Sequence, residues 1–351
     1  MHRADLVRRR LRSAVRRRRP RAGILMYHAI RRQDPDPWGI CVRPEHFDDQ
    51  LAVLAERRRV VDAGAIAAGE VYAPDGGAVA VTFDDGYADN LTAALPLLEK
   101  YEIPATVFVI GNAVGRPRDF WWEALERAVL LPRRLPDRLH FPFGTGARIR
   151  PVHVDDDPAG LAGWRADEQP PVTARQQLFR DLWDEIVVLE PAAQDDATAH
   201  LTRWAGADST PDPHRRSLTV DEFLELAGHP LITIGGHTLD HPSLIDWPAE
   251  RQHAQIAAGN ARLTELTGAP VTRLSYPYGR HDASARRAVA GLGLDFACTS
   301  RPEATIGGDD PFALPRIQVP DVDGDEFDRM LSVRHRLTGT RKPGQVSRAA
   351  R

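Results

Sequence analysis

The sequence has little cysteine and no long apolar run, and each absence restricts where in the cell we expect the protein. Two cysteines, Cys41 and Cys298, stand in 351 residues. They are too few for a disulfide framework, so we expect a reducing compartment. No apolar run approaches the roughly 20 residues needed to span a bilayer. The stretch Gly23 to Ile30 contains a histidine and lacks a small-residue cleavage site, which makes it a poor signal peptide. These absences predict a cytoplasmic location.

The overall composition is that of a globular protein. Hydrophobic residues make up 42% of the chain and charged residues 27%. This balance excludes disorder for most of the length, and the length suits one large α/β domain or two small ones.

Basic charge is concentrated at the N-terminus. Residues 1–22 carry ten arginines against one aspartate, a local charge of +9, which leaves −12 for the rest of a chain whose total is −3. We predict a basic, disordered tail at 1–22 and a second disordered tail at 336–351. Contact of the basic tail with the inner face of an anionic membrane is the next interpretation, since each basic residue there contributes about 1 kcal/mol. No nucleic-acid partner is expected, because the acidic body would oppose it.

Short apolar runs alternate with amphipathic patterns, as in βα units around a parallel sheet. The strands that we expect are Gly23–Tyr27, Ala78–Phe83, Ala105–Ile110, Leu231–Ile234, Leu274–Tyr276, Phe296–Thr299 and Ile317–Val319. The expected helices are His46–Ala55, Asn90–Tyr101, Phe120–Leu130, Gln176–Leu189, one that a Thr219–Glu222 capping box opens, and Ala249–Leu266. From about 112 to 216, prolines and acidic clusters break the pattern, which predicts an insertion carried on the main domain.

The motif Thr82-Phe83-Asp84-Asp85-Gly86 ends a hydrophobic strand. Neighbouring side chains at a strand end point in different directions, so one carboxylate can bind a metal while the other faces a water molecule. The glycine allows a sharp turn and a close approach to a ligand. The alternative is a simple turn with a helix cap.

Two histidines, His237 and His241, follow a later strand and a Gly-Gly pair. If the segment turns helically, their imidazoles share one face, a spacing that suits a common metal. Such a pair alone is often a surface feature. Together with a strand-end aspartate it gives three ligands and leaves positions open for water, as a catalytic metal requires.

Aromatic residues lie close to these motifs. Tyr276, Pro277 and Tyr278 belong to a turn after a strand, and Tyr87 directly follows the aspartate motif. Their rings, with those of Phe120-Trp121-Trp122, are candidates for stacking on sugars. Ordinary packing in a turn or in the core is the alternative.

The order of the motifs resembles that of the polysaccharide deacetylase family, which shares the NodB homology domain and is similar to carbohydrate esterase family 4. That family carries T-F-D-D-G, H-[ST]-x-x-H and R-x-P-Y in this order. Asp84-Asp85, His237–His241 and Pro277-Tyr278 match them. The resemblance covers roughly residues 24–111 and 217–320.

The resemblance implies a fold and a chemistry. The fold is a distorted (β/α)7 TIM-like barrel over 23–335 with a mainly helical insertion at about 112–216. One divalent metal, zinc by ligand type with iron, cobalt or manganese as options, would be held by Asp85, His237 and His241. Asp84 would be the general base. The reaction would remove N-acetyl groups from the amino sugars of a polysaccharide or saccharide precursor.

This sequence departs from the family pattern at two positions, so other residues must supply the missing groups. Ser275 stands where the family has the arginine that orients the base, and we expect Arg316 to supply that charge. The family's C-terminal Leu-x-His, the source of the general acid, has no clear match. We expect His28, at the end of the first predicted strand, to fill that role, as it does in similar branches of the family.

Two other functions stay open at this point. One is the hydrolysis of a different non-peptide amide, such as a formylated amino sugar. The other is a catalytically silent carbohydrate-binding protein, which the missing arginine and histidine would suit.

Overall fold

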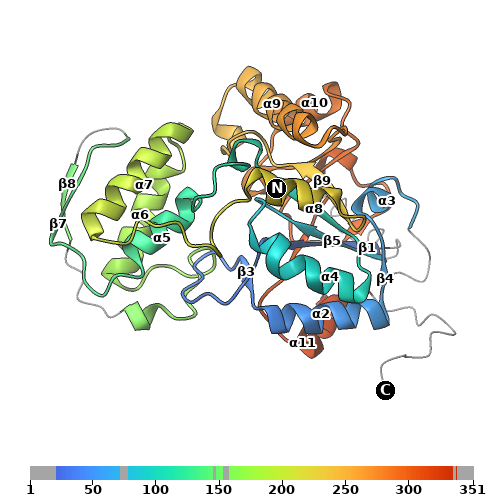
Figure 1. The fold of residues 1–351 in the computed structure, drawn as a ribbon, viewed down its shortest axis with the longest axis horizontal. Helices are drawn as coiled ribbons and strands as arrows, with labels where there is room; N and C mark the ends of the chain where they lie inside the picture. Colours follow the sequence, from blue (N-terminus) through green and yellow to red (C-terminus); the bar gives the residue numbers. More distant parts are fainter. Residues whose placement is uncertain (1–20, 72–77, 145–147, 153–157, 335–336, 338–351) are drawn as a thin grey trace, which may run out of the picture.

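The centre of the protein is a curled sheet of mostly parallel strands (Figure 1). The structure is a computed structural model that describes residues 21–71, 78–144, 148–152, 158–334 and 337. Its strands are β1 (Arg21–Tyr27), β4 (Arg59–Val60), β5 (Ala78–Phe83), β6 (Ala105–Val109), β9 (Ile232–Gly236), β10 (Arg273–Ser275), β11 (Phe296–Cys298), β12 (Thr305–Ile306) and β13 (Ile317–Gln318). The short strands β2 (Ala29–Ile30) and β3 (Cys41–Val42) pair separately.

The strand order closes most of a barrel. Neighbours run β11–β10–β9–β6–β5–β1, and β13 pairs in parallel with the free side of β1. A parallel bridge from Cys298 to Leu314 links β11 to the chain just before β13. The predicted fold, a distorted TIM-like barrel, is confirmed, and its strands point their carboxyl ends to one face.

The strands form where the sequence is apolar without alternation. All six residues of β5 are buried, and β1 is buried from Ala22 to Tyr27. Strands in a parallel sheet are covered on both faces, which is why they read as continuous hydrophobic runs.

Helices cover the outside of the sheet. They are α2 (Pro44–Arg57), α3 (Ala63–Ala67), α4 (Leu95–Tyr101) after a π-helical turn η1 (Asn90–Ala94), α8 (Val220–Gly228), α9 (Ala249–Thr267), α10 (Ala283–Gly291) and α11 (Gly324–Arg329). The shorter turns are η2 (Gly111–Ala113), η3 (Pro158–Leu161), η4 (Leu244–Asp246), η5 (Pro277–Gly279), η6 (Pro311–Ala313) and η7 (Met330–Arg334). The capping box that opens α8 is present: Glu222 N donates to the Thr219 hydroxyl, and Thr219 N to the Glu222 carboxylate.

Most of the chain between η2 and α8 forms a second layer beside the barrel, at the left of Figure 1. It contains α5 (Trp121–Val129), α6 (Ala174–Ile186), α7 (Pro191–Ala205) and the hairpin of β7 (Arg138–Phe141) and β8 (Arg148–Pro151). These elements share their own hydrophobic core, which includes Leu125, Phe179 and Leu201. Antiparallel bridges Asp119–Arg216 and Tyr87–Ser217 bring the two ends of this segment together.

Several details differ from the sequence-based expectations, which did not include α3, α10, α11 or the hairpin of β7 and β8. β1 starts at Arg21, because Ala22 pairs with Thr305 and is fully buried, so the predicted tail ends two residues earlier. Leu337 is buried in the barrel core and donates its N–H to the Leu331 carbonyl, so the C-terminal tail starts later than predicted. The rest of both predicted tails lies outside the described residues. Helix α7 was not predicted, because its buried face is small, with Ala197 and Leu201.

Candidate active site

The polar residues of the three motifs meet at the carboxyl ends of the barrel strands. His28 follows β1, Asp84 and Asp85 follow β5, His237 and His241 follow β9, and Tyr278 follows β10. In barrels of parallel strands this end is where binding and catalytic groups gather, because the loops there converge on one opening.

Asp85, His237 and His241 form a buried triad. The Nε2 atoms of the two histidines lie 3.4 Å and 3.6 Å from Asp85 Oδ1, and one ligand atom from each residue falls within 4.8 Å of the others. His237 Nδ1 lies 2.7 Å from the Ser275 carbonyl, so Nδ1 carries the proton and Nε2 is free. Burial, with the neighbouring His237, lowers the pKa of His241 to about 3 and keeps that ring neutral. This donor set fits a divalent transition metal.

The loop that carries the histidines is not the helical turn that the sequence suggested. Thr238 and His241 both have left-handed backbone conformations, with φ of 64° and 60°, and so does Asp85, with φ of 73°. Non-glycine residues hold such conformations only where the surroundings enforce them. Gly259 of α9 allows this loop to lie directly against the helix, since a Cβ on it would lie 2.4 Å from the Thr238 carbonyl carbon.

Asp84 has a different set of partners from its neighbour. Arg316 Nη1 and Nη2 donate to its two oxygens at 2.7 Å and 2.6 Å, and the Ser275 hydroxyl donates to it at 3.1 Å. Arg316 is fully buried and is itself held by the Thr299 carbonyl at 3.0 Å. Burial alone would raise the pKa of Asp84, but Arg316 and His237 outweigh it and hold that pKa well below its usual range. Arg316 also donates to the Ser275 hydroxyl at 2.7 Å, so both side chains lie against Asp84.

A cavity of about 400 Å³ opens over these groups. His28, Asp84, Asp85, His237 and His241 line its floor. Nδ1 of His28 is buried there without a hydrogen-bond partner. Burial lowers the pKa of His28, while Asp85 and Asp84 act in the opposite direction.

Aromatic rings form the walls of this active-site cavity. Tyr278 and Trp122 pack against His241, with ring centroids 4.6 Å and 4.9 Å away. Trp38 and Trp183 pack on each other at 3.9 Å and complete the wall. Trp38 precedes β3 and Trp183 belongs to α6, so sequence reasoning missed both. Neither stands next to a recognisable motif, and only their packing places them here.

Two predicted sugar-binding tyrosines do not face this cavity. Tyr87 is fully buried, and its hydroxyl donates to Glu123 and accepts from Trp122 Nε1. Tyr276 is also fully buried, its hydroxyl donates to the Phe312 carbonyl, and its backbone N–H is used by the Cys298 carbonyl at 3.0 Å. The expectation that these two rings contact sugar is wrong, because packing covers both. Pro277 is buried in the turn that presents Tyr278.

A buried charge cluster lies behind Tyr87. Glu123 of α5 is bound by Arg31, which follows β2, and by Arg215, which precedes α8. Arg31 also pairs with Asp89 at 3.2 Å. Paired charges of this kind tolerate burial, whereas removal of one partner leaves an uncompensated charge. The cluster therefore fixes α5, and with it Trp122, against the barrel.

A barrel mouth that combines a carboxylate pair with two imidazoles is typical of hydrolases that act with a bound metal. The family model for polysaccharide deacetylase matches residues 72–130 and 193–297. The chain belongs to the polysaccharide deacetylase family.

Individual relatives agree with this assignment. The curated protein YxkH from Bacillus subtilis (strain 168) is 21% identical to this chain over 250 residues. Its name assigns it provisionally to the polysaccharide deacetylases. That match covers 71% of this chain and 54% of YxkH, so the chain spans about half the length of this relative.

Two solved structures share the fold. The Streptococcus pyogenes deacetylase PplD, in complex with acetate, has a TM-score of 0.54 at 16% identity, covering 88% of this chain and 96% of that one. IcaB from Ammonifex degensii has a TM-score of 0.53 at 19% identity, covering 89% and 96%.

Proposed function

We propose that this protein is a metal-dependent hydrolase that removes N-acetyl groups from amino sugars of a saccharide. The observation that carries the proposal is the division of partners between two adjacent carboxylates. Asp85 faces two histidines, and Asp84 faces Arg316. One carboxylate is thereby available to a metal, and the other stays ionised beside it as a base. We also propose that residues 23–335 form one barrel unit that carries an insertion.

Asp85, His237 and His241 would hold the metal, with zinc as the first choice and iron, cobalt or manganese as alternatives. When bound, the metal lowers the pKa of water towards about 7 and polarises the carbonyl of the amide. His237 Nδ1 donates to the Ser275 carbonyl at 2.7 Å, which fixes that ring in the ligating tautomer.

Asp84 would take the proton from the attacking water. Its low pKa keeps it ionised, and the paired hydrogen bonds from Arg316 fix the plane of its carboxylate. A second proton must reach the leaving nitrogen, because an amine anion is a very poor leaving group. His28 would deliver it, since it lines the same cavity and its Nδ1 has no partner in the described structure. Burial lowers its pKa, so contact with the bound substrate must favour its protonated form.

The aromatic walls support a saccharide as the substrate. Sugar rings present apolar C–H faces that stack on aromatic side chains, and Tyr278, Trp122 and Trp183 offer such faces around the cavity. Within the described residues no helix is long and apolar enough to cross a membrane. Contact of the N-terminal tail with an anionic membrane and a cytoplasmic location remain predictions from the sequence.

The proposal is tested with the variant Asp84→Asn. It keeps the shape of the side chain and removes the base, so we expect one metal per chain, as in the wild type, and loss of acetate release from N-acetylated chito-oligosaccharides. Asp137→Asn, an exposed aspartate of the insertion, is the matched control. Formate released from a formylated sugar in place of acetate would favour a deformylase. Saccharide binding without either product would favour a silent binding protein.

A further inference from the structure

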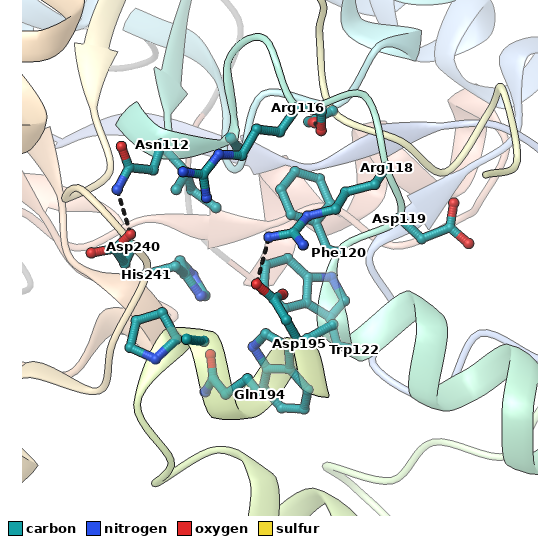
Figure 2. Close-up of a pocket in the computed structure, with 16 residues that line it drawn as sticks. Asn112, Arg116, Arg118, Asp119, Phe120, Trp122, Gln194, Asp195, Asp240 and His241 are labelled. Carbon is teal, nitrogen blue, oxygen red and sulfur yellow. Dashed lines mark hydrogen bonds and ion pairs between the residues drawn. The ribbon is translucent and has the colours of Figure 1, made fainter. Parts of the chain in front are cut away.

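A second cavity, of about 280 Å³, adjoins the active-site cavity (Figure 2). His241 and Trp122 line both cavities. The second cavity is bounded by the chain that follows β6, by the start of α5 and by the N-terminus of α7. The reaction proposed above makes no use of it.

His241 presents an unpartnered nitrogen at this boundary. The residue is 6% exposed, and its Nδ1 is buried with no hydrogen-bond partner among the residues that the structure describes. Nε2 faces Asp85 at 3.6 Å and is the atom that would bind the proposed metal, so Nδ1 would carry the proton and act as a donor. Figure 2 shows the ring projecting into the second cavity between Asp240 and Arg118. A buried donor in this position calls for an acceptor.

The lining of the second cavity supplies positive charge as well. Arg116 forms no ion pair with any described residue, and Figure 2 shows its side chain reaching over the cavity. Helix α7 begins here with Pro191 and has no acidic residue in its first turn. Its cap residue Glu190 does not cap the helix, because its carboxylate is held by Arg251 at 2.7 Å and 2.9 Å. The positive end of the helix therefore faces the cavity without a counter-charge.

The acidic side chains of the lining are already engaged. Asp195 accepts from Arg118 at 2.7 Å. Asp240 accepts from Asn112 and Gln255 at 2.7 Å and 2.8 Å. Asp119, the third, is paired with Arg127 and accepts the Asp212 N–H at 2.9 Å. Two of these carboxylates are paired with arginines and the third accepts from two amides, so Arg116 is the guanidinium of the lining that remains for a ligand.

We propose that the second cavity binds an oxyanion, a phosphate or carboxylate group, through Arg116, His241 Nδ1 and the N-terminus of α7. Its oxygens accept from all three, and charge-assisted hydrogen bonds of this kind are the strong ones. Two sources share this chemistry. The group is carried by the substrate, which is then a phosphorylated or acidic saccharide, or it is a free anion. The assignment rests on the proposed metal site for the tautomer of His241.

The test uses the metal-loaded protein and titrates it with inorganic phosphate, with acetate, and with N-acetylglucosamine 1-phosphate beside N-acetylglucosamine. Calorimetry gives the dissociation constants for wild type, Arg116→Gln and the control Arg134→Gln, an exposed arginine outside the cavity. We expect Arg116→Gln to weaken phosphate at least about tenfold and Arg134→Gln to leave it unchanged. A crystal structure with phosphate should place the anion within hydrogen-bond distance of His241 Nδ1.

The same titrations distinguish an anionic group carried by the substrate from a free anion. A substrate-borne group makes the sugar phosphate bind more tightly than the neutral sugar, and Arg116→Gln removes that advantage. A free anion binds without any such advantage. No phosphate binding, or binding that Arg116→Gln leaves intact because the anion sits on the metal, overturns the proposal. Acetate release from a neutral substrate by the same preparation distinguishes this failure from a failure of the proposed function.

Discussion

The two walls of the active-site cavity are built differently. On the barrel wall, polar groups hold one another: Asp84 by Arg316 at 2.6 Å and 2.7 Å, and His237 by the Ser275 carbonyl at 2.7 Å. On the insertion wall, ring faces from α5 and α6 pack together, as Trp121 and Trp183 do at 4.6 Å. The barrel wall therefore positions the groups proposed to react, and the insertion wall provides the aromatic surface proposed to contact the saccharide. Variants of the first should change kcat, and variants of the second should change KM.

The largest effect is expected for Arg316→Met. It leaves Asp84 buried without its counter-charge, at a cost of about 3–5 kcal/mol, part of it in the free energy of unfolding. We expect kcat/KM for deacetylation to fall about 10³-fold while the metal content stays near one per chain. Arg316→Lys, which keeps the charge but not the paired geometry, should recover part of the loss. Wild-type activity in Arg316→Met would show that Asp84 needs no such partner.

Replacement of His28 by alanine should come next. Loss of a general acid typically lowers turnover by about 10²-fold or more, and the triad of Asp85, His237 and His241 should keep its metal. His253→Ala, an exposed histidine on α9, serves as the control. Loss of metal from the His28 variant would instead make it a ligand.

On the insertion wall, Trp183→Ala should raise KM by about fivefold and change kcat less than twofold, because a stacked ring contributes about 1 kcal/mol. Trp204→Ala, on α7 and outside the cavity, should change neither. Steady-state kinetics on one oligosaccharide measures both. A fall in kcat with unchanged KM in Trp183→Ala would contradict the division of roles between the two walls.

The smallest effect concerns the seam where the insertion returns to the barrel. Glu222 pairs with Arg216 at 2.6 Å, and this hydrogen bond lowers the pKa of Glu222 to about 2. A lowered carboxyl pKa contributes stability above its unfolded value of about 4.5 and loses it as pH falls towards 2. Glu222→Gln, which keeps the cap of α8, should lower the free energy of unfolding by about 1 kcal/mol at pH 7. Urea unfolding at several pH values should show that the difference in free energy of unfolding between Glu222→Gln and the wild type becomes smaller below about pH 4.5.

The sequence predicted the barrel wall better than the insertion wall for a physical reason. Asp84, Asp85, His237 and His241 follow apolar runs directly, and parallel strands bring their ends to one place. The positions of these four follow from local pattern and topology. Arg316 was found differently, as a charge that could replace the family arginine missing at Ser275.

The local sequence pattern does not show which aromatic side chains are exposed to the active-site cavity. Tyr87 stands beside the aspartates in sequence yet packs under Trp122, whereas Trp183 lies far from any motif and lines the cavity. Which ring faces a cavity depends on contacts between distant segments, such as Trp38 with Trp183 at 3.9 Å. The close packing of Thr238, whose φ is 64°, against Gly259 of α9 is likewise a contact between distant segments.

The most direct test of the central claim is the metal content of the purified wild type beside Asp85→Ala and His237→Ala, with acetate release measured on each. The account predicts one metal per chain in the wild type and loss of both metal and activity in the two variants. Acetate release that persists without metal, or a wild type that takes up no metal when supplied with zinc, iron, cobalt or manganese, would contradict it.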